Sequence, residues 1–243
     1  MKKINLGLTK LELGLWGISV FAVFASSFFS DSIHIITVIA SLIGVTALIF
    51  VAKGYVLGQI LTILFAVFYG IISFCFKYYG EMITYLCMTA PIALGATISW
   101  LRHPYKGTKE VEVNRITKKQ VVVMIVLASI VTLAFYFILI ALGNANIIFS
   151  TVSITTSFIA SYLTFYRSPY YAIAYAANDL VLIVLWVLAT MENISYFPMI
   201  VCFIMFFVND IYGFLSWKKR EKKQRLAERA HADIETFCAE QKE

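Results

Sequence analysis

Two short motifs in the last third of the chain carry side chains that could bind a polar ligand inside an apolar protein. Asn178-Asp179 precedes Trp186, and Asn209-Asp210 precedes Trp217, each time with six residues between the Asp and the Trp. Because residues seven apart return to nearly the same face of a helix, each Asp shares a stripe with its Trp and has an Asn beside it. We predict that the two Asn-Asp pairs meet near the middle of two antiparallel helices.

The two aspartates need a cavity or a partner, because they lie in strongly apolar sequence. Of the 14 acidic residues, only Asp179 and Asp210 lie well inside apolar stretches, and Glu12 lies close to a boundary. A carboxylate inside a bilayer costs at least about 2.5–3.5 kcal/mol. The pair can form a substrate or ion site, or it can join neighbouring helices, which stabilises a bundle by about 0.6 kcal/mol per hydrogen bond. Both interpretations stay open.

Further candidates are amides and rings on the same helices or in the first half of the chain. Gln59 and Tyr69 are ten positions apart on one side of a predicted helix, and Tyr212 follows Asn209 by three. An amide both donates and accepts hydrogen bonds, and tyrosine adds a ring with a hydroxyl. With no Lys or Arg nearby, such a pocket suits a neutral or cationic planar ligand and disfavours a phosphorylated one. Trp186 also fits this pocket, although each aromatic could instead pack in the core.

Apolar helices long enough to cross a membrane position these residues. Hydrophobic residues make up 60% and charged residues 14% of the 243 positions, which is too few charges for a soluble globular surface. A helix needs about 20 apolar residues to cross a bilayer. Eight stretches qualify, at 11–29, 33–51, 55–77, 81–100, 119–142, 147–166, 170–190 and 195–217. They predict one all-α transmembrane domain, 1–217, followed by a charged cytoplasmic tail, 218–243.

The basic residues gather in alternate loops, which predicts that both termini are cytoplasmic. The opposite loops are poor in cations and hold Asp31, the pair Lys77 and Glu81, and Glu192. This bias explains the net charge of +6 without a nucleic-acid partner. The basic residues of the cytoplasmic side are Lys2, Lys3, Lys10, Lys53, Arg102, Lys106, Lys109, Arg115, Lys118, Lys119, Arg167, Lys218, Lys219, Arg220, Lys222 and Lys223.

A weak internal repeat with an offset of 117 residues relates the two halves. It pairs Ser99-Trp100 with Ser216-Trp217, Tyr69 with Trp186, and Tyr79 with Tyr196. The predicted span 119–142 between the halves makes them enter the membrane in the same direction. Parallel repeats of this kind occur in sugar transporters of the SWEET type, with a substrate site near the midplane between them.

Three segments resemble the bacterial nicotinamide riboside transporters, the PnuC-type family. They are Gln59 to Tyr69, Tyr175 to Asp179 with Trp186, and Asn209 to Gly213 with Trp217. The resemblance covers nearly the whole chain. It implies a SWEET-like fold of two parallel three-helix bundles joined by a linking transmembrane helix (3+1+3), here with an extra N-terminal helix. It also implies a homotrimer in the bacterial cytoplasmic (inner) membrane, with one vitamin molecule between the bundles of each protomer.

The resemblance further implies roles for single residues and a transport mechanism. Amides would hold the carboxamide and the ribose hydroxyls, rings would pack on the pyridinium, and nearby Asp would favour its charge. Uptake would be facilitated diffusion, or uniport, with the riboside trapped by intracellular phosphorylation. Relatives that carry thiamine or another cationic aromatic vitamin stay open as an alternative. The implied substrate-binding residues are Gln59, Tyr69, Asn178, Trp186, Asn209 and Tyr212.

Other classes of protein fit the sequence less well. The four cysteines lack a paired spacing, and the three histidines are dispersed, so no metal or disulfide is indicated and no cofactor is expected. The case for a membrane enzyme would depend on the two aspartates alone. A retinal-type photoreceptor needs a lysine inside the last span, and this chain has none there, since Lys218 lies beyond it. An ion-coupled symporter with Asp179 or Asp210 as the ion site is the strongest rival to a uniporter.

Overall fold

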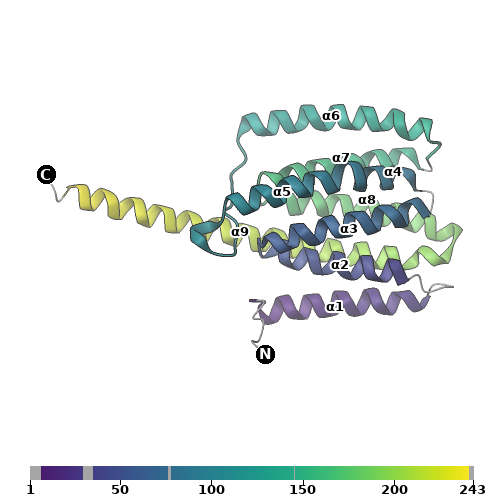
Figure 1. Cartoon of the computed structure of the whole chain (residues 1–243), viewed down its shortest axis with the longest axis horizontal. Coiled ribbons are helices and arrows are strands. Elements are labelled where there is room, and N and C mark those ends of the chain that lie inside the picture. Colours follow the sequence, from purple (N-terminus) through teal and green to yellow (C-terminus); the bar gives the residue numbers. More distant parts are fainter. Residues whose placement is uncertain (1–6, 30–34, 76–77, 145, 241–243) are drawn as a thin grey trace.

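The computed structural model describes residues 7–29, 35–75, 78–144 and 146–240. The regular structure in this part of the chain is helical, and the connecting loops add two isolated bridge pairs. The helices run nearly parallel to one another, and the last one extends far beyond the bundle (Figure 1). They are α1 Lys10–Ser26, α2 Ile35–Ala52, α3 Val56–Cys75, α4 Tyr79–Ile83, α5 Ala90–Arg102, α6 Lys118–Ala141, α7 Ile147–Phe165, α8 Tyr171–Glu192 and α9 Phe197–Glu240.

Seven helical segments of the described chain are long and apolar enough to cross a membrane. They correspond to the predicted spans from 33–51 onward. The bounds differ by a few residues, except that the last segment, Ile194–Ala230, continues well beyond the predicted end at 217. The predicted first span, 11–29, is shorter than expected, because α1 has 17 residues and therefore measures about 26 Å against about 30 Å of hydrocarbon. This helix lies alongside the bundle, against α9 and α2 (Figure 1).

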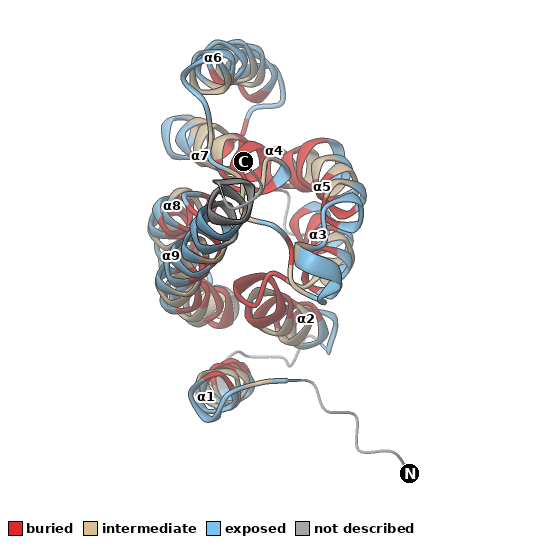
Figure 2. Cartoon of the chain, turned by 90° about the vertical axis from the view of Figure 1, so that its left-hand side faces the viewer, coloured by how far each residue is buried: buried red, intermediate tan, exposed pale blue. Residues whose placement is uncertain are grey.

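Viewed from one end, α2, α3, α5, α7, α8 and α9 form a ring with their buried faces inward (Figure 2). Helices α6 and α1 lie outside this ring on opposite sides. Helix α6 packs almost entirely on α7. Only 6% of the residues in its most apolar 18-residue stretch are buried. Its exposed side chains are largely Val, Ile, Leu and Phe, as expected for a surface in contact with lipid.

The structure brings the predicted basic loops to one end of the bundle, called here the basic end. The Arg220 guanidinium donates to the backbone carbonyl of Lys53 at 2.7 Å and contacts the Glu110 carboxylate at 3.2 Å. Arg167 donates to the carbonyl of Glu112 at 3.1 Å. The opposite end, called the far end, holds the junctions between α3 and α4, α6 and α7, and α8 and α9. Asp31 and Lys77 of the predicted cation-poor loops lie outside the described residues.

No helix break separates the transmembrane part from the predicted tail, because α9 continues without interruption to Glu240. The first turns of α9 beyond residue 217 are partly buried. The side chains of Arg220 and Gln224 are buried, and Gln224 accepts a hydrogen bond from the backbone N–H of Val113 at 2.8 Å. The start of the tail therefore packs against the α5–α6 loop.

The two Ser-Trp motifs make matching hydrogen bonds at the basic end. In each motif the serine hydroxyl and the tryptophan N–H donate to two consecutive backbone carbonyls at the end of a helix in the other half of the chain. The bonds are Ser99 to Phe165 at 3.1 Å, Trp100 to Thr164 at 3.0 Å, Ser216 to Ala52 at 3.0 Å, and Trp217 to Val51 at 2.9 Å. Two equivalent sets of hydrogen bonds, one from each half to the other, thus join the two halves at this end.

A π-helical segment, Thr84–Thr89, interrupts the span between α4 and α5. Pro91 lies at the start of α5 and has no backbone N–H, so it cannot make the helical hydrogen bond to the residue four positions earlier. Such wider turns are frequent at functional sites because they change the direction in which side chains point. Here the segment presents Tyr85 and Thr89 to the interior of the ring.

Candidate functional site

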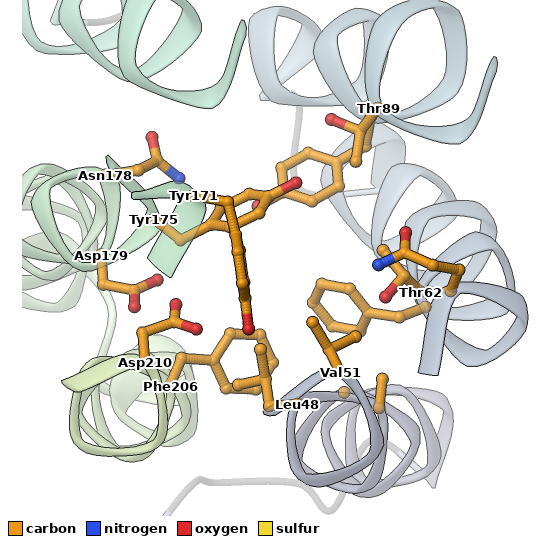
Figure 3. A pocket seen from close by; sticks show the side chains of 15 residues that line it. Leu48, Val51, Thr62, Thr89, Tyr171, Tyr175, Asn178, Asp179, Phe206 and Asp210 are labelled. Carbon is orange, nitrogen blue, oxygen red and sulfur yellow. The ribbon is translucent and has the colours of Figure 1, made fainter. Parts of the chain in front are cut away.

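A small cavity lies inside the ring, between the two halves of the chain (Figure 3). Its volume is about 60 Å³, which corresponds to roughly two water molecules. None of the described residues that line it is Lys or Arg. The lining residues that carry polar groups are Gln59, Thr62, Tyr85, Thr89, Tyr171, Tyr175, Asn178, Asp179 and Asp210.

Asp179 on α8 and Asp210 on α9 bring their carboxyl groups together at the edge of this cavity (Figure 3). Each residue is only 3% exposed. One oxygen of Asp179, Oδ2, has no hydrogen-bond partner among the described residues. Two facing carboxyl groups in a buried site favour a cation, because they repel each other when both are charged. The predicted meeting of the two motifs is therefore found for the aspartates.

Asn178 lies beside this pair and is held in a fixed orientation by α7. Its side-chain oxygen accepts hydrogen bonds from Ser153 Oγ at 3.2 Å and from Thr156 Oγ1 at 2.8 Å. Because the oxygen is occupied, the amide presents its NH₂ group as a donor toward the cavity (Figure 3). Gln59 lines the opposite wall from α3 and is 2% exposed. These two predicted amides are thus placed to hold a polar ligand.

Tyr69 and Trp186 form an aromatic layer next to the cavity rather than its wall. Both side chains are fully buried, and the indole N–H of Trp186 donates to the Tyr69 hydroxyl at 3.1 Å. The ring of Tyr85 connects this layer to the cavity, since it lines the cavity and its centroid lies 4.3 Å from that of Tyr69. A ligand would reach Tyr69 and Trp186 only if the cavity extended toward the far end.

The structure does not bring Asn209 and Tyr212 to this cavity. The amide nitrogen of Asn209 donates to Ser19 Oγ of α1 at 2.9 Å, and the Tyr212 hydroxyl donates to Glu12 Oε1 of α1 at 3.0 Å. The reason is helical geometry: consecutive residues point about 100° apart, so Asn209 faces α1 when Asp210 faces the cavity. Their contact with substrate is untested and remains an implication of the family resemblance, which this arrangement of the two side chains does not support.

Several lining residues were not singled out from the sequence. Tyr171 and Tyr175 precede Asp179 by eight and four positions on α8, so the stripe that relates Asp179 to Trp186 also contains them. Helical spacing could therefore have found both tyrosines. Tyr85 and Thr89 could not be found in this way, because they lie on the π-helical segment, where the ordinary helical period does not hold.

Comparison with known proteins decides the family. The model of the family described as "Nicotinamide mononucleotide transporter" matches residues 34–219. The chain belongs to this family. The predicted PnuC-type resemblance is therefore confirmed, and α1 lies before the matched part. All the candidate site residues lie within the part that matches the family.

A named relative and a solved structure, both called PnuC, resemble this chain over most of their length. The nicotinamide riboside transporter PnuC of Neisseria mucosa is 25% identical over 190 residues, which cover 76% of this chain and 72% of that protein. A solved structure described as the crystal structure of the vitamin B3 transporter PnuC has the same fold, with a TM-score of 0.77 and 22% identity. The alignment covers 89% of this chain and 94% of that chain. Because its described part contains seven helices apolar and long enough to cross a membrane, this family member is a multi-pass membrane protein.

Proposed function

We propose that this chain transports nicotinamide riboside across the membrane and binds it in the cavity between its two halves. The observation that carries the proposal is the lining of that cavity, which combines two facing carboxyl groups, two amides and several phenol rings and has no Lys or Arg among the described residues. A pyridinium ring is a planar cation, so aromatic faces and buried carboxylates both stabilise it. Gln59 and Asn178 would hold the carboxamide or the ribose hydroxyls.

The riboside is favoured over the mononucleotide for an electrostatic reason, although the family is described by the mononucleotide. A phosphate group would bring negative charge beside Asp179 and Asp210, and no lining Lys or Arg would balance it. The printed name of the relative from Neisseria mucosa also specifies the riboside. Thiamine, another aromatic cation, is the alternative substrate because it fits the same electrostatic description.

The cavity must widen before it can hold a nucleoside. Its volume of about 60 Å³ is well below the roughly 300–1,000 Å³ of typical ligand pockets. The present arrangement therefore corresponds to a closed conformation. Movement of one half against the other would enlarge the cavity toward Tyr69 and Trp186, as alternating access between repeats requires.

We also propose the finer architecture that the family resemblance implies. Helices α2 to α5 and α7 to α9 form two parallel bundles, α6 links them, and α1 is an addition. The reciprocal Ser-Trp hydrogen bonds and the position of α6 outside the ring support this 3+1+3, SWEET-like arrangement. The bundle sits in the bacterial cytoplasmic membrane as a homotrimer, with the basic end and both termini in the cytoplasm. The charge bias of the loops supports this orientation.

The proposed mechanism is uniport, with phosphorylation inside the cell trapping the riboside. The test is uptake of labelled riboside by proteoliposomes that hold purified protein and no ion gradient. We expect the internal and external concentrations to become equal, and we expect labelled mononucleotide to stay outside. Uptake only in the presence of a proton or sodium gradient would replace uniport with ion coupling at Asp179 or Asp210. Absence of riboside uptake under every condition would contradict the proposed function.

A further inference from the structure

Glu81 is a buried acid without a partner, which the sequence placed in a cation-poor loop. In the structure it lies on α4, is 1% exposed, and neither of its carboxylate oxygens has a hydrogen-bond partner among the described residues. The other buried acids differ: Glu12 contacts Lys53 at 3.1 Å, and Asp179 and Asp210 face each other. An unpaired carboxylate inside a membrane protein is expensive and is retained where it serves a function.

The groups around Glu81 are neutral hydroxyls and phenols. The hydroxyl of Ser153 on α7 lies nearby, but it donates its hydrogen to Asn178 at 3.2 Å. Glu81 also acts electrostatically on the phenols of Tyr69 on α3, Tyr78 before α4, and Tyr85. Burial raises the pKa of Tyr78 to about 12, so this phenol stays neutral. No cation among the described residues neutralises the carboxylate.

Two of these neighbours connect Glu81 to the cavity. Tyr85 follows Glu81 by one turn and lines the cavity, and Ser153 is hydrogen-bonded to Asn178, which also lines it. Since α4 begins at the far end of the bundle, Glu81 lies on the far-end side of Tyr85, which lines the cavity. The aromatic layer of Tyr69 and Trp186 occupies the same region.

We propose that Glu81 supplies the carboxylate of an outer cation site, which an aromatic organic cation passes between the far end and the central cavity. A carboxylate among aromatic rings is the chemistry that recognises such a cation, because both the charge and the ring faces attract it. The site would select charged over neutral rings before the ligand meets Asp179 and Asp210. This inference rests on the proposed function, since it specifies what the transporter selects.

The test compares a charged and an uncharged ligand of nearly equal shape. Calorimetry with the purified full chain would measure binding of nicotinamide riboside and of its 1,4-dihydro form, whose ring carries no charge. For Glu81→Gln we expect the affinity for the riboside to fall about tenfold and that for the dihydro form to change less than about twofold. Glu192→Gln removes an exposed acid at the same end and should change neither affinity.

Each alternative result has a defined meaning. If Glu81→Gln lowers the affinity for both ligands equally, or for neither, the result would overturn the role of Glu81 and leave the proposed function standing. Failure of the unmodified protein to bind the riboside would instead contradict the proposed function. If Glu81→Gln does not fold, Glu81→Asp keeps the charge and should keep the preference for the charged ring. Recovery of folding in a Lys77→Gln, Glu81→Gln double variant would reveal an ion pair and would also overturn the proposal.

Discussion

Asp179 and Asp210 determine the charge of the cavity, and their placement follows from the spacing of two motifs. The sequence predicted that they meet, because an amphipathic stripe can be read wherever a helix is regular. It did not predict that Asn209 faces α1, since the sequence alone does not show which of two adjacent polar residues points inward. It also placed Glu81 at the boundary between a loop and the predicted span 81–100, because nothing in the local sequence revealed that α4 begins at residue 79 and buries it.

Removal of charge from the aspartate pair should weaken binding of a cationic ligand. We predict that Asp179→Asn and Asp210→Asn each lower the affinity for nicotinamide riboside, and that the double variant lowers it at least about tenfold. The reason is that asparagine keeps the shape of the side chain and removes its charge. Calorimetry on the purified variants is the measurement, and Asp233→Asn, an exposed change on the tail, is the control. Unchanged affinity in the double variant would show that the pair only joins α8 and α9.

At the scale of elements, the helices were largely predictable and their irregularities were not. Long apolar runs bounded by polar residues predicted the bounds of six spans and the start of the seventh to within a few residues, but the last helix continues well beyond 217. The π-helical segment at Thr84–Thr89 and the short length of α1 were missed, because both depend on local hydrogen bonding rather than on hydropathy. The missed segment matters for function, since it supplies Tyr85 and Thr89 to the cavity.

The close packing of α2 on α3 depends on a glycine. A Cβ atom at Gly58 would overlap the backbone nitrogen of Val51 and lie 2.8 Å from the carbonyl carbon of Phe50. Because backbone cannot retreat as a flexible side chain can, we predict that Gly58→Ala destabilises the protein by about 1–3 kcal/mol. Thermal unfolding in detergent would show this as a lower midpoint. Gly14→Ala is the matched control, since a Cβ there meets nothing within 4 Å, and an unchanged midpoint for Gly58→Ala would contradict the prediction.

For the whole molecule, the two halves surround the cavity and are joined by reciprocal hydrogen bonds at the basic end. Trp100 and Trp217 approach with ring centroids 5.3 Å apart, and each donates to a carbonyl of the other half. The offset of 117 residues between the two motifs indicated this relation, but the reciprocal hydrogen bonds became evident only from the structure. The cavity lies between the halves, where a movement of one against the other would change its volume most.

The central claim is that nicotinamide riboside binds in this cavity, and calorimetric titration of three proteins tests it most directly. The proteins are the unmodified chain, Asn178→Ala and Asn209→Ala. The unmodified chain should bind the riboside. Asn178→Ala should bind it at least about tenfold more weakly, because a buried ligand group loses its hydrogen-bond partner. Asn209→Ala should keep an affinity within about threefold of that of the unmodified chain, because Asn209 bonds to α1 and not to the ligand. Loss of binding in Asn209→Ala with full binding in Asn178→Ala would contradict the account and move the site to the α1 side of α9.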